Sequence, residues 1–200
     1  MSLQDKVVVI MGASSGIGAA TARLLAERGA KLTLAARRLA RLEEIKSAYP
    51  EASIETVEAD VTDMAAVQSV IDHTVAKFGR VDVLFNNAGI MPVNNLSELA
   101  HQEWQQMLDI NVKGVLNGIA AALPVMRKQK FGHVISTSSV LGYEVLPGYA
   151  AYSGTKFAVR AIMEGLREEE RQNGIKTTVI APGSVKTELF DSINNRAFYN

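Results

Sequence analysis

The sequence predicts an α/β fold in which helices cover both faces of one parallel sheet. Short apolar runs alternate with stretches of helical periodicity along the chain, and short loops join them. Joined by right-handed crossovers, such units give a doubly wound, Rossmann-like sheet with strand order 3-2-1-4-5-6. No linker, low-complexity segment or short repeat interrupts residues 1–200, so we expect a single domain.

The expected strands and helices alternate from the first strand to the last. The strand pattern covers residues 6–11, 31–36, 53–59, 81–85, 132–137 and 176–180. The helical pattern covers residues 19–28, 39–48, 65–78, 102–127 and 152–172. In residues 65–78, for example, Val67, Val70 and Ile71 lie on one helical face. Sheets of this kind bind ligands at the carboxyl ends of their strands, so functional residues are expected directly after each strand.

Composition excludes several classes of partner. The 21 basic and 21 acidic residues cancel, which leaves no basic surface for nucleic acid or an anionic membrane. The basic residues within 127–130 fall at the expected end of a helix, where cations suit the dipole. The chain has no cysteine, and its three histidines lack ligand spacing, so no metal site is expected. No signal-peptide layout is present and no apolar run approaches the ~20 residues of a membrane span. We therefore expect a cytoplasmic protein.

A glycine-rich turn follows the first strand, in the order Gly12-Ala-Ser-Ser-Gly16-Ile-Gly18. Without a β-carbon, glycine lets the backbone lie close to a pyrophosphate, and the next helix offers its amino terminus to the phosphate charge. Glycine also closes ordinary loops, but the position between a strand and a helix favours a dinucleotide. We expect Ser14, Ser15 and Ile17 to join the three glycines in binding it.

A tyrosine and a lysine lie one turn apart on the last expected helix. Tyr152 and Lys156 share one helical face, separated by a rise of ~6 Å, and Ser139 follows the fifth strand. Reduction of a carbonyl by hydride creates an alkoxide, which needs a proton and a hydrogen-bond donor. A free tyrosine has a pKa of ~10, and a nearby ammonium lowers it. A tyrosine and lysine at this spacing also occur in ordinary amphipathic helices.

Together these segments resemble the short-chain dehydrogenase/reductase family. The glycine spacing is similar to its T-G-x-x-x-G-x-G motif, although Met11 stands where threonine is common. Ser139, Tyr152 and Lys156 are similar to its serine and Y-x-x-x-K motif, and Asn111 stands at its fourth catalytic position. The similarity covers nearly the whole chain and implies an enzyme that interconverts an alcohol with a ketone or aldehyde.

The resemblance implies a role for each of these four residues. Tyr152 is expected to be the general acid for reduction and the base for oxidation, and Ser139 to hydrogen-bond the substrate oxygen. Lys156 is expected to hold the nicotinamide ribose and to lower the pKa of Tyr152, with the positive charge of the oxidised nicotinamide acting in the same direction. Asn111 is expected to anchor a water between Lys156 and solvent.

The residues after the second strand indicate the cofactor. A carboxylate there would bind the adenosine ribose and repel a 2′-phosphate, whereas Ala36 offers none and Arg37 presents a fork of donors. The family uses this contrast, so the resemblance implies NADP(H), with Arg37 and Arg38 near the phosphate. Arg38 in particular is also consistent with a solvated charge before a helix.

Three further segments resemble cofactor-binding motifs of the family. Asp60 and Val61 are expected at the adenine, although Asp60 also suits a turn. The family's N-N-A-G motif is matched by residues 86–89, so Asn87, Ala88 and Gly89 are expected to line the cofactor, while the amides are also suited to bracing the sheet. The expected contacts after the sixth strand are Pro182, Gly183, Val185 and Thr187.

The substrate, the assembly and the carboxyl end are less well defined. Residues between Ser139 and Tyr152 suit either an apolar substrate pocket or loop packing, namely Leu141, Tyr143, Val145, Leu146 and Tyr149. We expect a homodimer or homotetramer, because the corresponding family helices pair across a dimer axis. Family members usually continue further, so we also expect a substrate-capping segment and a seventh strand beyond this sequence.

Two other functions remain open at this stage. One is a related epimerase or dehydratase, which the glycine spacing and the short substrate region disfavour. The other is an NADP(H)-binding sensor or scaffold without turnover. A sensor needs only the cofactor loop, so the presence of Ser139, Tyr152 and Lys156 together argues against it.

Overall fold

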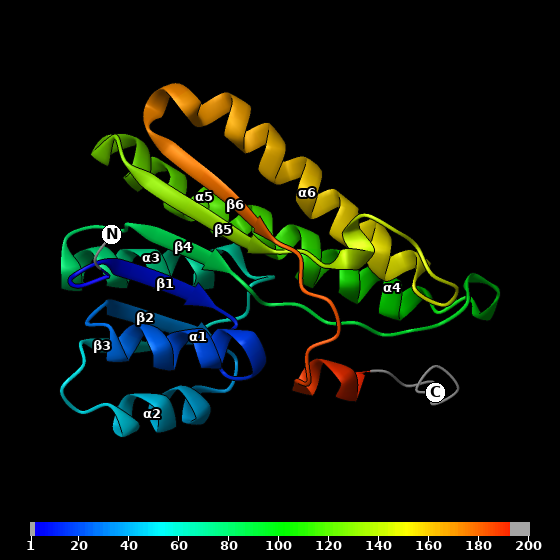
Figure 1. The fold of residues 1–200 in the computed structure, drawn as a ribbon, viewed down its shortest axis with the longest axis horizontal. Coiled ribbons are helices and arrows are strands. Elements are labelled where there is room, and N and C mark those ends of the chain that lie inside the picture. Colours follow the sequence, from blue (N-terminus) through cyan, green and yellow to red (C-terminus); the bar gives the residue numbers. More distant parts are fainter. Residues whose placement is uncertain (1–2, 193–200) are drawn as a thin grey trace.

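The computed structural model describes residues 3–192, which form one parallel sheet in the order β3-β2-β1-β4-β5-β6. Every neighbouring pair of strands is parallel, as Figure 1 shows, and the order is the predicted one. The strands are β1 (Val7–Met11), β2 (Lys31–Ala36), β3 (Ile54–Glu58), β4 (Val83–Asn86), β5 (Gly132–Thr137) and β6 (Ile175–Ile180).

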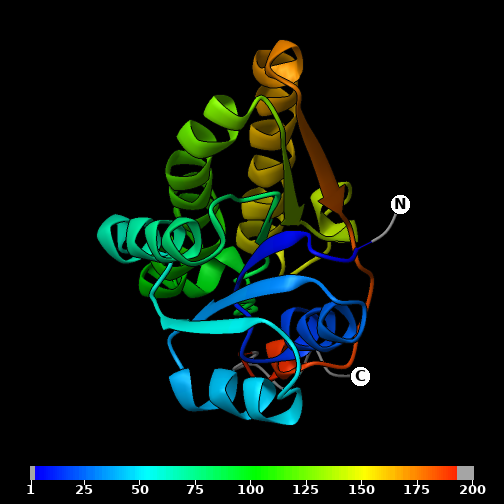
Figure 2. The same cartoon turned by 90° about the vertical axis from the view of Figure 1, so that its left-hand side faces the viewer.

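Helices cover both faces of the sheet, and each face has its own apolar core (Figure 2). The helices are α1 (Gly16–Glu27), α2 (Leu39–Ala48), α3 (Met64–Phe78), α4 (His101–Met107), α5 (Gly114–Gln129) and α6 (Ala150–Glu170). Helices α1 and α2 supply one core, whereas α3, α5 and α6 supply the other. Short 3₁₀ turns are η1 (Leu96–Glu98), η3 (Val140–Gly142), η4 (Arg171–Asn173) and η5 (Glu188–Ser192).

The buried central strand β1 explains why helices cover both faces of the sheet. All five residues of β1 are buried, and alternate side chains enter opposite cores, with Val9 and Met11 on one face and Val8 and Ile10 on the other. Such a strand can form only where apolar helices cover both faces. The carboxyl ends of the parallel strands then meet at one edge of the sheet, where the site lies.

The single helix predicted over residues 102–127 is wrong in its middle. Between α4 and α5 the backbone forms a π-helical segment, η2 (Leu108–Lys113). A wider turn shifts the side-chain register, so that Leu108 is 50% exposed whereas Asn111 is buried. The polar partners of Asn111, described below, stabilise this irregular turn.

The run His101–Gln129 is long and apolar enough to cross a membrane by length and composition alone. This corrects the expectation that no apolar run approaches that length. The same test is passed by a helix that covers a core, and α5 packs against α3, β4 and β5. Buried Asn111 and Asn117 interrupt the apolar face and donate their amides to protein partners. These contacts assign the run to the packing of the domain.

Candidate active site

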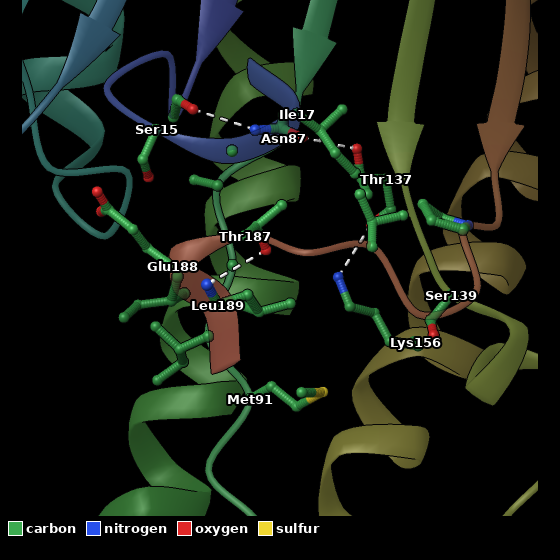
Figure 3. Close-up of a pocket in the computed structure, with 18 of the residues that line it drawn as sticks. Ser15, Ile17, Asn87, Met91, Thr137, Ser139, Lys156, Thr187, Glu188 and Leu189 are labelled. Atoms are coloured by element: carbon green, nitrogen blue, oxygen red, sulfur yellow. Dashed lines mark hydrogen bonds between the residues drawn. The ribbon is translucent and has the colours of Figure 1, made fainter. Parts of the chain in front are cut away.

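A cavity of about 770 Å³ lies at the carboxyl ends of the strands. Its volume is in the range of cofactor and substrate sites. It is lined by residues that follow each of the six strands, so the topology brings together segments far apart in the sequence (Figure 3). All the predicted site residues line it except Gly18 and Asn111, which lie directly behind the lining.

The glycine loop is shaped by two left-handed residues, Gly12 with φ 80° and Gly16 with φ 53°. A β-carbon on Gly12 would lie 2.7 Å from the backbone of Ala88, so the loop is pressed against the segment after β4. A β-carbon on Gly18 would lie 2.2 Å from the Gly12 carbonyl oxygen. Gly18 therefore lets α1 pack closely on the loop, while Gly12 and Gly16 leave its backbone open to the cavity.

Asn87 braces three strands at the centre of the site. Its Nδ2 donates to the Gly12 carbonyl oxygen at 3.0 Å, and its Oδ1 accepts from Thr137 Oγ1 at 3.1 Å (Figure 3). The bracing interpretation of this amide is thus correct, and Asn87 also lines the cavity together with Ala88 and Gly89.

Charged side chains gather at the end of the cavity next to β2 and β3. Arg38 donates from Nη2 to Ser14 Oγ at 3.3 Å and lies 2.9 Å from a carboxylate oxygen of Glu188. Arg37 lines the cavity with an exposed side chain. Burial raises the pKa of Asp60, but hydrogen bonds from Thr62 and the charge of Arg37 outweigh it and hold that pKa below its usual value. Arg38 is therefore paired with Glu188, although its side chain is 48% exposed.

Tyr152 and Lys156 are almost fully buried at the other end, both 4% exposed. The Ser139 side chain lies close enough to the Tyr152 phenol to lower its pKa, and Ser139 Oγ accepts from the Leu141 backbone N–H at 3.1 Å. Lys156 Nζ donates to the Thr137 carbonyl oxygen at 3.0 Å, and Figure 3 shows it reaching into the cavity. The neighbouring Ser138 donates to the Lys156 carbonyl oxygen, which leaves Ser139 as the serine beside the phenol.

Burial governs the titration of this pair. It raises the pKa of Tyr152 to about 12, against a smaller lowering by the neighbouring Ser139 side chain. It also lowers the pKa of Lys156 to about 8. Among the groups of the chain, the balance is opposite to the expected lowering of the tyrosine pKa, because desolvation disfavours both charged forms. A phenol with so high a pKa is protonated at neutral pH and suits proton donation.

Asn111 joins the loop after β4 to α6. Its Oδ1 accepts from the Ile90 N–H at 2.9 Å, and its Nδ2 donates to the Ile90 carbonyl oxygen at 2.9 Å and to Thr155 Oγ1 at 3.1 Å. A β-carbon on Gly89 would lie 3.3 Å from Asn111 Oδ1 and 3.5 Å from Lys156 Nζ. The amide therefore lies directly behind the lysine, while its expected water remains a prediction.

The segment after β6 closes one side of the cavity. The Pro182 carbonyl oxygen accepts from the Val140 N–H at 3.0 Å, which fixes this segment to the loop that carries Ser139. Thr187 lies against the glycine loop, since a β-carbon on Gly16 would be 3.2 Å from Thr187 Cβ. Thr187 Oγ1 accepts from the Leu189 N–H, as Figure 3 shows. The chain after β6 thus runs from the loop that carries Ser139 to the glycine loop.

The Tyr152 end of the cavity is largely apolar. Met91, Leu141 and Tyr152 belong to a small core with Trp104 packed against it. Of the five loop residues considered from sequence, Leu141, Leu146 and Tyr149 line the cavity, whereas Tyr143 stacks on Arg160 at 3.6 Å. The lining also includes residues that sequence reasoning did not assign to the site, among them Ile90, Met91, Ile110, Glu144 and residues 188–190. These segments carry no motif, so only the fold brings them to the cavity.

The fold and the site together define a nicotinamide-dinucleotide oxidoreductase of the doubly wound class. A family model for short chain dehydrogenases matches residues 6–197. The chain belongs to this family.

Relatives of the chain include oxidoreductases of several bacteria. It is 54% identical to an uncharacterized oxidoreductase of Staphylococcus saprophyticus over 98% of this chain and 80% of that protein. It is 50% identical to one of Listeria monocytogenes, over 98% and 81% of the two chains. These similarities support an oxidoreductase activity and leave the substrate open.

Solved structures of the family superpose closely. A short-chain dehydrogenase/reductase from Burkholderia phymatum in complex with NAD has a TM-score of 0.92 at 32% identity, over 96% of this chain and 70% of that one. An alcohol dehydrogenase from Thermococcus sibiricus complexed with 5-hydroxy-NADP has a TM-score of 0.89 at 32% identity, over 96% and 82%. Levodione reductase has a TM-score of 0.89 at 37% identity, over 93% and 74%.

Proposed function

We propose that this protein is an NADP(H)-dependent oxidoreductase that interconverts an alcohol with a ketone or aldehyde, with Tyr152 as its general acid and base. The observation that carries the proposal is the buried Tyr152 beside the Ser139 side chain at the cavity, with Lys156 one turn further along α6. A buried phenol, hydroxyl and amine at one end of a dinucleotide-sized cavity suit proton transfer to a substrate oxygen.

The residues that line the cavity support a dinucleotide bound across the carboxyl ends of the strands. The glycine loop with Ser14, Ser15 and Ile17 would hold the pyrophosphate, because Gly12 and Gly16 have no side chain where the loop lines the cavity. Asp60 and Val61 would line the adenine. Residues 87–89 would line the nicotinamide ribose, which Lys156 would hold, and Pro182, Gly183, Val185 and Thr187 would surround the nicotinamide. The bound cofactor supplies or accepts the hydride.

The chain itself handles the proton. In reduction, Tyr152 Oη gives its proton to the substrate oxygen while Ser139 Oγ hydrogen-bonds the same atom, so that the developing negative charge is met by two groups. The raised pKa of Tyr152 keeps that proton in place at neutral pH. In oxidation Tyr152 takes the proton of the alcohol, so its pKa must fall; the ammonium of Lys156 and the charge of the oxidised cofactor act in that direction.

Residues after β2 support NADP(H) over NAD(H). Two of the solved relatives are complexes with NAD and with 5-hydroxy-NADP, so the fold accepts both types of nucleotide. Ala36 offers no carboxylate to the adenosine ribose, and Arg37 and Arg38 line the cavity beside it. Guanidinium groups suit a 2′-phosphate, and no carboxylate of β2 would repel it.

The apolar lining by Met91, Leu141 and Leu146 suits a small carbonyl compound with an apolar skeleton. Leu116 on α5 and Phe157 on α6 are 45% and 39% exposed, which suits a homodimer or homotetramer formed through these helices. We place the enzyme in the cytoplasm.

The test is a screen of NADPH oxidation against short aldehydes, aliphatic ketones, cyclic ketones and 3-oxo acids, repeated with NADH. Turnover with NADPH and a carbonyl compound supports the proposal. Turnover with NADH alone would correct the cofactor, and binding of NADPH without turnover of any carbonyl would favour a sensor.

A further inference from the structure

A carboxylate occupies the cationic end of the cavity. Glu188, the first residue of η5, lies 2.9 Å from Arg38 Nη1 and 3.3 Å from Arg41 Nη1, with one carboxylate oxygen on each guanidinium. Figure 3 places its side chain beside Ser15 of the glycine loop. Glu188 and Arg38 both line the cavity, so this ion pair faces the space in which a dinucleotide would lie.

The carboxylate uses the donors that a phosphate group would need. Arg38 also donates to Ser14 Oγ at 3.3 Å, which ties the guanidinium to the glycine loop. The hydrogen bond from Arg38 lowers the pKa of Glu188, and the charges of Arg38 and Arg41 and a hydrogen bond from Ser15 add to that lowering. Glu188 is therefore ionised at neutral pH and pairs with Arg38 in the loop after β2 and with Arg41 in α2.

We propose that Glu188 is an internal competitor for the 2′-phosphate of NADP(H) and so reduces the preference of the enzyme for the phosphorylated cofactor. The 2′-phosphate must displace the carboxylate from Arg38 before it can bind there. NADH carries no such group and leaves the ion pair in place. This inference rests on the proposed function only in assigning the cationic end to the adenosine ribose.

The ion pairs of Glu188 are weak enough for a phosphate group to displace the carboxylate, so Glu188 competes with the phosphate and does not prevent its binding. The side chains of Arg38, Arg41 and Glu188 are 48%, 48% and 39% exposed, and exposed ion pairs are weak. A phosphate group carries more charge than a carboxylate and binds guanidinium groups strongly. The phosphate can therefore displace Glu188 at a small cost, and that cost falls on NADPH alone.

The test compares the Kd values of NADPH and NADH, measured by calorimetry at fixed ionic strength, for the wild-type protein and Glu188→Gln. Glutamine keeps the size of the side chain and removes its charge. We expect NADPH to bind about threefold more tightly to the variant, the scale of one exposed ion pair, with NADH changed much less. Glu169→Gln is the control, because Glu169 is an exposed acid near the far end of α6.

A second variant pair locates the effect. In an Arg38→Met background, Glu188→Gln should tighten NADPH binding by less than it does in the wild-type background, because the competition acts through Arg38. Unchanged or weaker NADPH binding by Glu188→Gln would overturn the inference, and so would equal tightening of both nucleotides. Since these are binding measurements, an inactive wild-type enzyme would refute the proposed catalysis, whereas the Kd values would still test the role of Glu188.

Discussion

Lys156 Nζ lies 5.6 Å from the centre of the Tyr152 ring and donates a hydrogen bond to the Thr137 carbonyl oxygen. The amine is thus held beside the phenol by the end of β5, and both groups are buried. A lysine so placed costs stability when it is charged, which links the stability of the fold to pH.

Substitution of Lys156 by Met should stabilise the fold at neutral pH. Burial lowers the pKa of Lys156 to about 8 from 10.5, so below pH 8 the folded protein bears the full cost of a buried ammonium. That cost diminishes as the folded protein loses the proton between pH 8 and 10.5, and above this range both states are neutral. Urea unfolding at about pH 7, 9 and 10.5 should show the variant most stabilised near pH 7, by up to about 3 kcal/mol. A stabilisation of the variant that increases with pH would contradict this prediction.

Arg37→Asp should reverse the cofactor preference. The new carboxylate would accept hydrogen bonds from an adenosine ribose and repel a 2′-phosphate, so KM for NADPH should rise at least about tenfold more than KM for NADH. Steady-state kinetics with both nucleotides and one carbonyl substrate measures this. An unchanged ratio of the two KM values would refute the assignment of Arg37.

Gly12→Ala should disrupt the cofactor loop. Gly12 has a φ of 80°, and its β-carbon would lie 2.7 Å from the backbone of Ala88, so the loop or the segment after β4 must move. We expect NADPH affinity to fall by at least about tenfold. Gly165→Ala is the matched control, because that glycine lies within α6 and a β-carbon there would meet no neighbouring side chain or loop within 4 Å. Equal affinities of the two variants would show that Gly12 is an ordinary turn residue.

Asn111→Leu should destabilise the protein through the loop after β4. The substitution leaves the Ile90 N–H and carbonyl oxygen without their side-chain partner in a partly buried position, at a cost of about 2 kcal/mol. Thr155 also loses a donor. Chemical denaturation measures the loss, and a variant as stable as the wild type would show that these hydrogen bonds are replaced by water.

The sequence predicts the sheet well, because the alternation of apolar runs and helices has one favourable parallel arrangement. Strand order and the position of the glycine loop follow from that pattern. The π-helical turn at Asn111 could not be predicted, since its hydrogen bonds depend on Ile90 and on Thr155, which lies 44 residues away. A periodicity of 3.6 residues describes the flanking helices equally well with or without one wide turn.

Some residues of the candidate site could be identified from the sequence, whereas others are brought to it only by the fold. Tyr152 and Lys156 could be identified because a spacing of four residues puts them on one face of any helix. Ser139 and the glycines could be identified because each lies in a segment that directly follows a strand. Glu188 could not, because its contact with Arg41 spans 147 residues and depends on where the chain after β6 turns back. The raised pKa of Tyr152 was also missed, since burial is a property of the packed fold.

Turnover of the Tyr152→Phe variant tests the central claim most directly. Phenylalanine fills the same space without the hydroxyl, so NADPH should still bind with a Kd close to the wild-type value, while kcat for carbonyl reduction should fall by about 10²- to 10⁴-fold. A variant that binds NADPH and retains a kcat near that of the wild type would contradict the account, because another group would then supply the proton.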